Sequence, residues 1–272
     1  MSATLVIEAG QTERQYWRDL WRFRELFYLL AWRDFLIRYK QTAVGIAWSL
    51  IRPLLMLLAV TAVGKAGSFS TGGAPPLLFY FCGLLPWQFF STAMSESGNS
   101  LVNNSNLVSK IYFPRLVVPA SSVIVSFMDF LIAAVFLVPL MLYYHVMPPG
   151  QVAFIPLFVL LDFALATGVG FWIAALTVKY RDFRFVVPFV VQFGAFVSGV
   201  IPITPHAHQT LRLIYSLNPT VGIIDGFRWC LLGGGNFVRP SELLLSTGVT
   251  TMLLLSGLRY FRKTERTFAD II

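Results

Sequence analysis

Long runs of apolar residues alternate along this chain with short polar segments. The runs cover residues 44–64, 77–97, 117–144, 152–178, 185–200 and 241–260. A helix needs about 20 predominantly apolar residues to cross the hydrocarbon core of a bilayer. The pattern therefore predicts an all-α polytopic membrane protein with six transmembrane helices in a single domain, 1–272. The first of these runs is interrupted by Arg52 and Pro53.

Residues 12–41, ahead of the first run, follow a different pattern. Side chains such as Trp17, Leu20 and Phe27 recur near helical spacing, with arginines between them. An amphipathic helix of this composition lies in the membrane interface rather than across the bilayer. We therefore expect an N-terminal interface helix over 12–41.

The segment 104–115, between the second and third runs, is also amphipathic. Asn104 to Asn106 can cap a helix by accepting backbone N–H bonds, and Pro114 would end it. One apolar stripe is expected between these limits, formed by Leu107, Val108, Ile111 and Tyr112. Such a stripe can dock into a protein groove or rest on the membrane surface, and the pattern leaves both open.

The segment from Ile201 to Pro240 has intermediate polarity and precedes the sixth run. Asn218 and Pro219 are typical of an N-cap and the first residue of a helix. Asp225 and Arg228 stand at i, i+3, so they can pair on that helix. They can equally contact a partner protomer, and the sequence does not discriminate.

Composition excludes a soluble globular domain. The chain is 56% hydrophobic and only 12% charged, whereas about a quarter of residues are charged in soluble domains. The formal net charge of +8 follows from the orientation of the spans. With the N-terminus in the cytoplasm, 16 of the 21 Lys and Arg residues lie on the cytoplasmic side and four on the other. The positive-inside rule therefore predicts cytoplasmic termini and a cytoplasmic segment 104–115, and nucleic-acid binding is not indicated.

Catalytic and metal-binding motifs are absent. The sequence has no GxxxxGK[ST] phosphate loop, no HExxH and no GxSxG. The histidines His145, His206 and His208 have no convincing metal-ligand partner, and two cysteines make no metal site. We expect neither a metal nor a cofactor in this chain, which is predicted not to be an enzyme. A partner or an ion gradient must then supply any energy.

Four ionisable residues fall within the predicted spans, at Arg52, Glu96, Asp129 and Asp162. Charges in a membrane are costly and usually functional. Asp129 and Asp162 lie half way along their spans, where they can serve either in function or as polar links between helices.

Six segments in order resemble one family. They are "RYKQTAVGIAWSLIRPLL" (38–55), "FCGLLPWQFF" (81–90), "NSLVNNSNLVSKIYFPRLVVP" (99–119), "VKYRDFRFVVPFVVQF" (178–193), "LNPTVGIIDGFRWCLLG" (217–233) and "YFRKTERTFADII" (260–272). The chain is similar to the membrane subunits of ABC exporters for cell-surface polysaccharides, that is, the O-antigen, capsule and teichoic-acid permeases of the ABC-2 type.

The resemblance implies a homodimer with two copies of a separate ATPase, which would hold ATP and Mg. It maps a coupling helix that docks on the ATPase to 104–115, and gate helices on the outer side to 205–233. The implied coupling residues are Asn106, Leu107, Val108, Lys110, Ile111, Tyr112, Phe113, Pro114 and Arg115. The end of the interface helix maps to Arg38, Tyr39, Lys40 and Gln41, and the gate to Asn218, Pro219, Asp225, Arg228 and Trp229.

One departure from the family concerns the end of the fifth run. Many relatives have a pattern like SPVxYP there, whereas this chain reads "SGVIPIT" (198–204). Gly199 replaces the first proline, and Ile203 stands near the usual aromatic. The shape of the gate is therefore expected to differ.

Aromatic side chains offer flat apolar faces to sugar rings, and Trp and Tyr add hydrogen bonds. The chain has 25 Phe, 7 Trp and 10 Tyr, so spans one, two and five are expected to form a channel wall. Ordinary lipid-facing aromatics are the alternative. The candidate lining residues are Trp48, Phe79, Tyr80, Trp87, Phe89, Phe90, Phe189, Phe193 and Phe196.

The expected function is ATP-driven export of a lipid-linked, O-antigen-like polysaccharide across the bacterial inner membrane. An ABC exporter of lipids or drugs would share this architecture with a different cargo. A membrane-embedded enzyme acting on glycolipids is the alternative outside transport.

Overall fold

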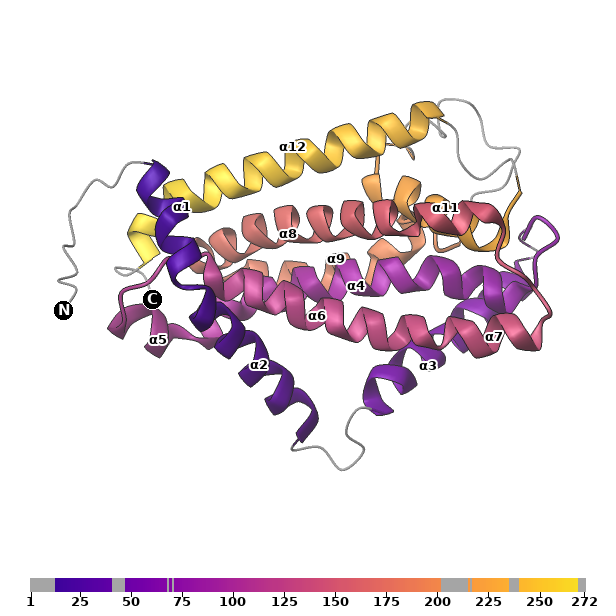
Figure 1. The fold of residues 1–272 in the computed structure, drawn as a ribbon, viewed down its shortest axis with the longest axis horizontal. Coiled ribbons are helices and arrows are strands. Elements are labelled where there is room, and N and C mark those ends of the chain that lie inside the picture. The colour runs from indigo at the N-terminus through magenta and orange to yellow at the C-terminus, as the bar shows by residue number, and fades with distance from the viewer. Residues whose placement is uncertain are drawn as a thin grey trace.

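The computed structural model describes residues 13–40, 47–67, 69, 71–201, 215, 217–234 and 240–268. In these ranges the regular structure is entirely helical (Figure 1). Gln41, the side chain of Trp48 and residues 205–214 of the predicted gate segment lie outside the described residues. The prediction of an all-α protein is confirmed for the described part.

Long apolar helices run along the main axis of the molecule (Figure 1). Four helical stretches of the described chain are long and apolar enough to cross a membrane, namely Pro76–Asn103, Val117–Tyr143, Gly150–Lys179 and Pro240–Thr267. Shorter apolar helices occupy Pro53–Ala66 and Phe183–Val197. The chain is therefore a multi-pass membrane protein, with four of the six predicted spans present at full length.

Two predicted helices are each broken in two. The interface helix consists of α1 (Glu13–Arg22) and α2 (Arg24–Lys40). The third predicted span consists of α6 (Val117–Val135) and α7 (Leu137–Tyr143). The second break is explained by Pro139, because a proline ring clashes with the carbonyl four residues earlier, here that of Val135.

Helix α4 (Pro76–Asn103) is the centre of the bundle. It packs against α3 (Ala47–Ala66), α6, α8 (Ile155–Lys179), α9 (Phe183–Val197) and α11 (Pro219–Leu232). Its aromatic side chains are buried on every side, and Phe89 contacts the rings of Phe127, Phe130 and Phe163. These contacts make α4 the helix around which the others are arranged.

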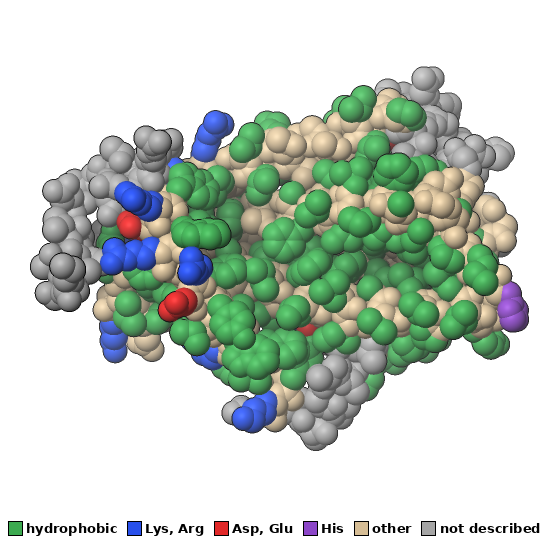
Figure 2. Space-filling view, in the orientation of Figure 1, with side chains coloured by type: hydrophobic (Ala, Val, Ile, Leu, Met, Phe, Trp, Pro, Cys, Tyr) green, Lys and Arg blue, Asp and Glu red, His purple; other side chains and the backbone are tan. Residues whose placement is uncertain are grey.

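A second apolar cluster lies at the end of the bundle where α1 begins and α12 ends (Figure 1). It joins α2, the segment after α4, the end of α12 (Pro240–Thr264) and the residues that follow α12. The residues that meet there include Leu30, Val108, Phe113, Phe261 and Phe268. Figure 2 shows Lys and Arg gathered at this end, hydrophobic side chains over the middle, and a histidine at the opposite end. This distribution has the polarity that the positive-inside rule requires.

Helices α8 and α12 approach each other closely through glycine. A Cβ atom added at Gly257 would lie 2.3 Å from the carbonyl oxygen of Gly168. Small residues allow membrane helices to pack with their backbones in contact. The pairing of the fourth and last apolar runs therefore depends on these two positions.

We predict that Gly257→Ala destabilises the protein by about 1–3 kcal/mol, because the added methyl group meets backbone that cannot turn aside. Thermal unfolding of the detergent-purified chain measures the effect. Gly248→Ala, on the same helix with no atom within 4 Å of the added carbon, is the matched control. Equal midpoints for the two variants would contradict close α8–α12 packing.

Candidate functional site

The segment Asn104 to Arg115 starts with a short helix, α5 (Ser105–Lys110). The carbonyl of Asn104 accepts the N–H groups of Leu107 and Val108 at 2.9 and 3.0 Å. Its side chain forms no cap: Nδ2 donates to the carbonyl of Ser100 at 2.9 Å, and Oδ1 accepts from Arg33 at 2.7 Å. Asn104 is thus at the N-cap position, but the prediction that its side chain caps the helix is wrong.

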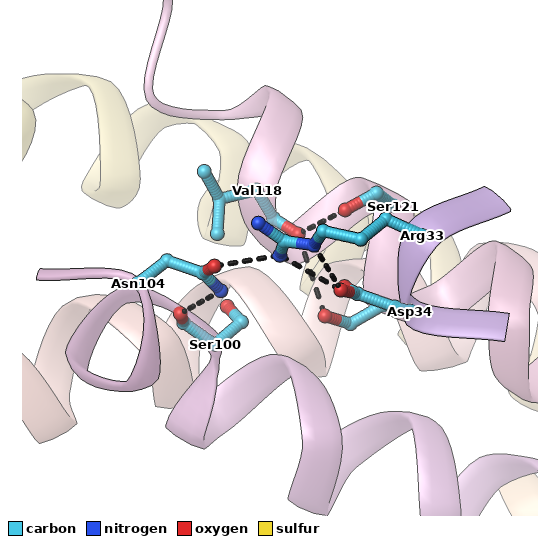
Figure 3. A network of polar contacts seen from close by, with 7 residues as sticks. Arg33, Asp34, Ser100, Asn104, Val118 and Ser121 are labelled. Atoms are coloured by element: carbon cyan, nitrogen blue, oxygen red, sulfur yellow. Dashed lines mark hydrogen bonds and ion pairs between the residues drawn. The ribbon is translucent and has the colours of Figure 1, made fainter. Parts of the chain in front are cut away.

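The start of the segment is fixed to the interface helix. Arg33 on α2 donates through Nη2 to Asn104 and pairs with Asp34 at 2.7 Å, so the guanidinium lies between the two side chains (Figure 3). Arg33 and Asp34 were not predicted from the sequence, because each is one of many polar residues on an amphipathic helix.

The predicted helix over 104–115 ends early. Ile111 has extended backbone angles (φ −122°, ψ 134°), so the helix stops before Pro114 is reached. The predicted stripe is consequently divided. Val108 is buried and Leu107 packs beside it, whereas Ile111 and Tyr112 are 55% and 51% exposed.

The remaining coupling candidates follow the same division. Asn106 and Lys110 are exposed, while Phe113 and Pro114 are buried. The segment therefore presents a small surface to the exterior, made of Asn106, Lys110, Ile111 and Tyr112, and its other apolar residues attach it to the bundle. We call these four residues the exposed loop surface.

The end of the segment is fixed to the C-terminal part of the chain. The backbone N–H of Arg115 donates to Oε1 of Glu265 at 2.8 Å, and the hydroxyl of Tyr16 on α1 donates to Oε2 at 2.9 Å. The Arg115 guanidinium donates in turn to the carbonyl of Glu265. Burial, and then the nearby Glu265, raise the pKa of the Tyr16 phenol, which keeps it a proton donor.

The end of the interface helix carries a cluster of charges. Arg38 pairs with Glu96 on α4 at 2.7 Å and with Asp129 on α6, and the hydroxyl of Tyr39 donates to the same Asp129 carboxylate. Asp129 therefore links two helices, which is the structural alternative left open by the sequence. Lys40 is exposed.

Asp162 is buried, and its Oδ2 has no hydrogen-bond partner in the described part of the chain.

Helix α11 contains the described part of the predicted gate. Asn218 accepts the N–H of Thr220 at 3.1 Å and Pro219 opens the helix, which confirms the predicted cap. Asp225 and Arg228 pair within the chain at 3.2 Å. Trp229 packs against Phe154 of the 3₁₀ helix η1 (Gly150–Phe154), with ring centroids 5.7 Å apart.

Arg228 is 1% exposed and holds the turn that follows α9. Its Nη1 and Nη2 donate to the carbonyls of Gly199 and Val200, each at 2.7 Å. The guanidinium also lies 4.0 Å from the centre of the Phe79 ring on α4. This arginine therefore joins α11, α9 and α4 at one point.

The sequence departure at Gly199 has a conformational reason. Gly199 has φ of +94°, a value that glycine adopts freely and that proline, fixed near −65°, cannot. The turn that presents its carbonyls to Arg228 is thus incompatible with a proline at position 199.

Comparison with known proteins identifies the family. The family model described as ABC-2 type transporter matches residues 25–232, from α2 to the end of α11. The chain belongs to the ABC-2 type transporter family.

Curated relatives match nearly the whole chain of this ABC-2 permease. The O-antigen export system permease protein RfbA of Myxococcus xanthus is 25% identical over 258 residues, covering 94% of this chain and 98% of the relative. Two proteins of the same name from Klebsiella pneumoniae are 25% and 24% identical, each covering 91% of this chain and 95% of the relative.

The aromatic residues considered as channel lining in this permease fall into two groups. Five of them are buried in the core of the single chain: Phe79, Tyr80, Trp87, Phe89 and Phe90. In this conformation they hold helices together and reach no surface. Three others, Phe189, Phe193 and Phe196 on α9, are 62%, 51% and 56% exposed.

Three residues that hold the segment 104–115, Tyr16, Arg33 and Glu265, were not predicted from the sequence. Tyr16 and Glu265 stand 249 positions apart, and neither falls on a periodic pattern that links them. Only the fold brings α1, the segment after α5 and the end of α12 together.

We predict that Gly83→Ala weakens the junction at Arg228, because the added Cβ would lie 2.6 Å from Nη2 of that arginine. The guanidinium must then move from its carbonyl acceptors, and hydrogen bonds to charged groups contribute about 1.5–3 kcal/mol each. The thermal unfolding midpoint should fall. Gly150→Ala, whose added carbon meets nothing within 4 Å, should not lower it, and a midpoint unchanged in both would refute the junction.

Proposed function

We propose that this ABC-2 permease is the membrane subunit of an ATP-driven exporter that moves a lipid-linked, O-antigen-like polysaccharide out across the bacterial inner membrane. The cargo is supported by the relatives, which are named O-antigen export system permeases and match over nine-tenths of both chains. The absence of a phosphate loop in the sequence supports an ATPase on a separate subunit that holds ATP and Mg.

The single observation that carries the proposal is the exposed loop surface. Ile111 and Tyr112 are large apolar side chains more than half exposed at the basic end of the molecule. Their segment is fixed at both ends by Arg33 and Glu265, so it is stiff enough to transmit a push. A rigid apolar projection of this kind suits docking into a groove on the ATPase.

In the proposed assembly, two copies of this chain work with two ATPase subunits. The cytoplasm holds both termini and the exposed loop surface, as the charge distribution favours. Helices α3 and α9 serve as the first and fifth of six spans, and α11 belongs to the gate on the outer side.

The polysaccharide path is proposed to follow α9. Phe189, Phe193 and Phe196 stand at i, i+4 and i+7, so they share one helix face, and the first two rings lie 4.6 Å apart. Exposed rings in such a row can stack against successive sugars. Closure of the ATPase dimer on ATP would push the two exposed loop surfaces and shift this face.

Deletion of the gene tests the function as a whole. We predict that finished polymer accumulates in the cytoplasm and disappears from the cell surface, and that a plasmid copy reverses both effects. Fractionation followed by glycan analysis measures the distribution. Complete loss of polymer would indicate a role in synthesis, and unchanged surface polymer with an altered lipid or drug phenotype would indicate another cargo.

The docking step is tested by the double variant Ile111→Asp, Tyr112→Asp. Two charges in an apolar groove should reduce co-purification of the ATPase at least about tenfold, since central interface residues contribute about 2 kcal/mol or more each. Insertion into the membrane should be unaffected. Met147→Asp, an 82% exposed apolar residue outside this segment, is the control and should retain the ATPase. Retention by both variants would exclude this docking surface.

A further inference from the structure

Glu265 occupies a position where three distant parts of the chain meet. It begins the 3₁₀ helix η2 (Glu265–Thr267), directly after α12. Its two carboxylate oxygens accept from different segments, Oε1 from the backbone of Arg115 and Oε2 from Tyr16. One side chain thus connects the last apolar helix with the interface helix and with residues 104–115, which we call the exposed loop segment.

Buried aromatic side chains hold the backbone on both sides of Glu265. Phe261 and Phe268 are both fully buried, and their rings meet with centroids 5.4 Å apart. Phe261 also contacts Phe171 of α8, at 5.7 Å. Because these aromatic anchors lie on both sides of Glu265, they hold its backbone against α8 and the end of α12.

The contact with Arg115 is made by the backbone, not only by the side chain. Residues 111–116 lie between α5 and α6 and form no regular helix, so the N–H of Arg115 has no helical acceptor. The carboxylate supplies the acceptor, and the Arg115 guanidinium closes a second bond to the Glu265 carbonyl. A displacement of the exposed loop surface is therefore passed to Glu265 through two hydrogen bonds.

We propose that Glu265 is a positioning residue for energy coupling: it joins the exposed loop segment to α12 and α1, so that the ATPase moves all three as one body. The inference rests on the proposed function and adds to it a transmission route that bypasses α5 and α6. A purely structural role would be different, because it would lower the amount of folded complex without changing the work obtained per ATP.

The test uses the purified complex with its cognate ATPase in proteoliposomes, and measures ATPase retained, ATP hydrolysed and polymer transported. Glu265→Ala should keep the ATPase bound, because the exposed loop surface is untouched, and should transport about tenfold less polymer per ATP, since both charged acceptor bonds are lost. Glu265→Gln keeps an acceptor for Arg115 and should recover most of the ratio of polymer transported to ATP hydrolysed. Arg266→Ala, the exposed neighbour, should resemble the wild type.

Tyr16→Phe provides a second, milder variant that removes one hydroxyl group. It should lower the ratio less than Glu265→Ala, and adding it to Glu265→Ala should cause no further loss, because the two residues share one bond. An unchanged ratio in Glu265→Ala, or a loss that only parallels the loss of bound ATPase, overturns the inference. Failure of the wild-type complex to transport polymer would instead overturn the proposed function.

Discussion

An arginine that lies among these apolar helices needs partners from the protein, because lipid hydrocarbon offers neither water nor a counter-ion. Arg38 meets two carboxylates, Glu96 and Asp129, while Arg228 meets Asp225 and two backbone carbonyls. These few polar contacts fix which helices can lie together. The larger apolar surfaces would tolerate many arrangements, since hydrophobic packing is not directional.

Both arginine clusters involve α4, at opposite parts of its length. Glu96, near its end, accepts from the interface helix, and Phe79, near its beginning, lies beneath the guanidinium of Arg228. The 28 residues of this helix span about 42 Å at 1.5 Å per residue. Its buried aromatic side chains lock it against its neighbours, so α4 provides a stiff connection between the basic end and α11.

Features set by one local rule were predictable from the sequence, whereas features set by contacts between distant residues were not. Hydropathy alone located the four full-length spans, and local helix chemistry placed Asn218 and Pro219. The segment 104–115 was misjudged, because Asn104 gives its side chain to Arg33 and Ile111 leaves the helix before Pro114 is reached. The channel lining stays a prediction: tertiary packing buries five of the aromatic candidates within the chain and leaves the three on α9 exposed. No periodicity relates Tyr16 to Glu265.

The turn after α9 shows why a cation is buried at this place. Helix α9 has 15 residues, or about 22 Å, which is shorter than the hydrocarbon core of about 30 Å. Gly199 and Val200, which follow the helix, are buried, so their carbonyls need donors from the protein itself. Arg228 supplies the missing donors to Gly199 and Val200, and a positive group is also favoured at the C-terminal end of a helix dipole. Gly199, with its positive φ, presents its carbonyl to that guanidinium, so the glycine and the arginine together form the turn that ends α9.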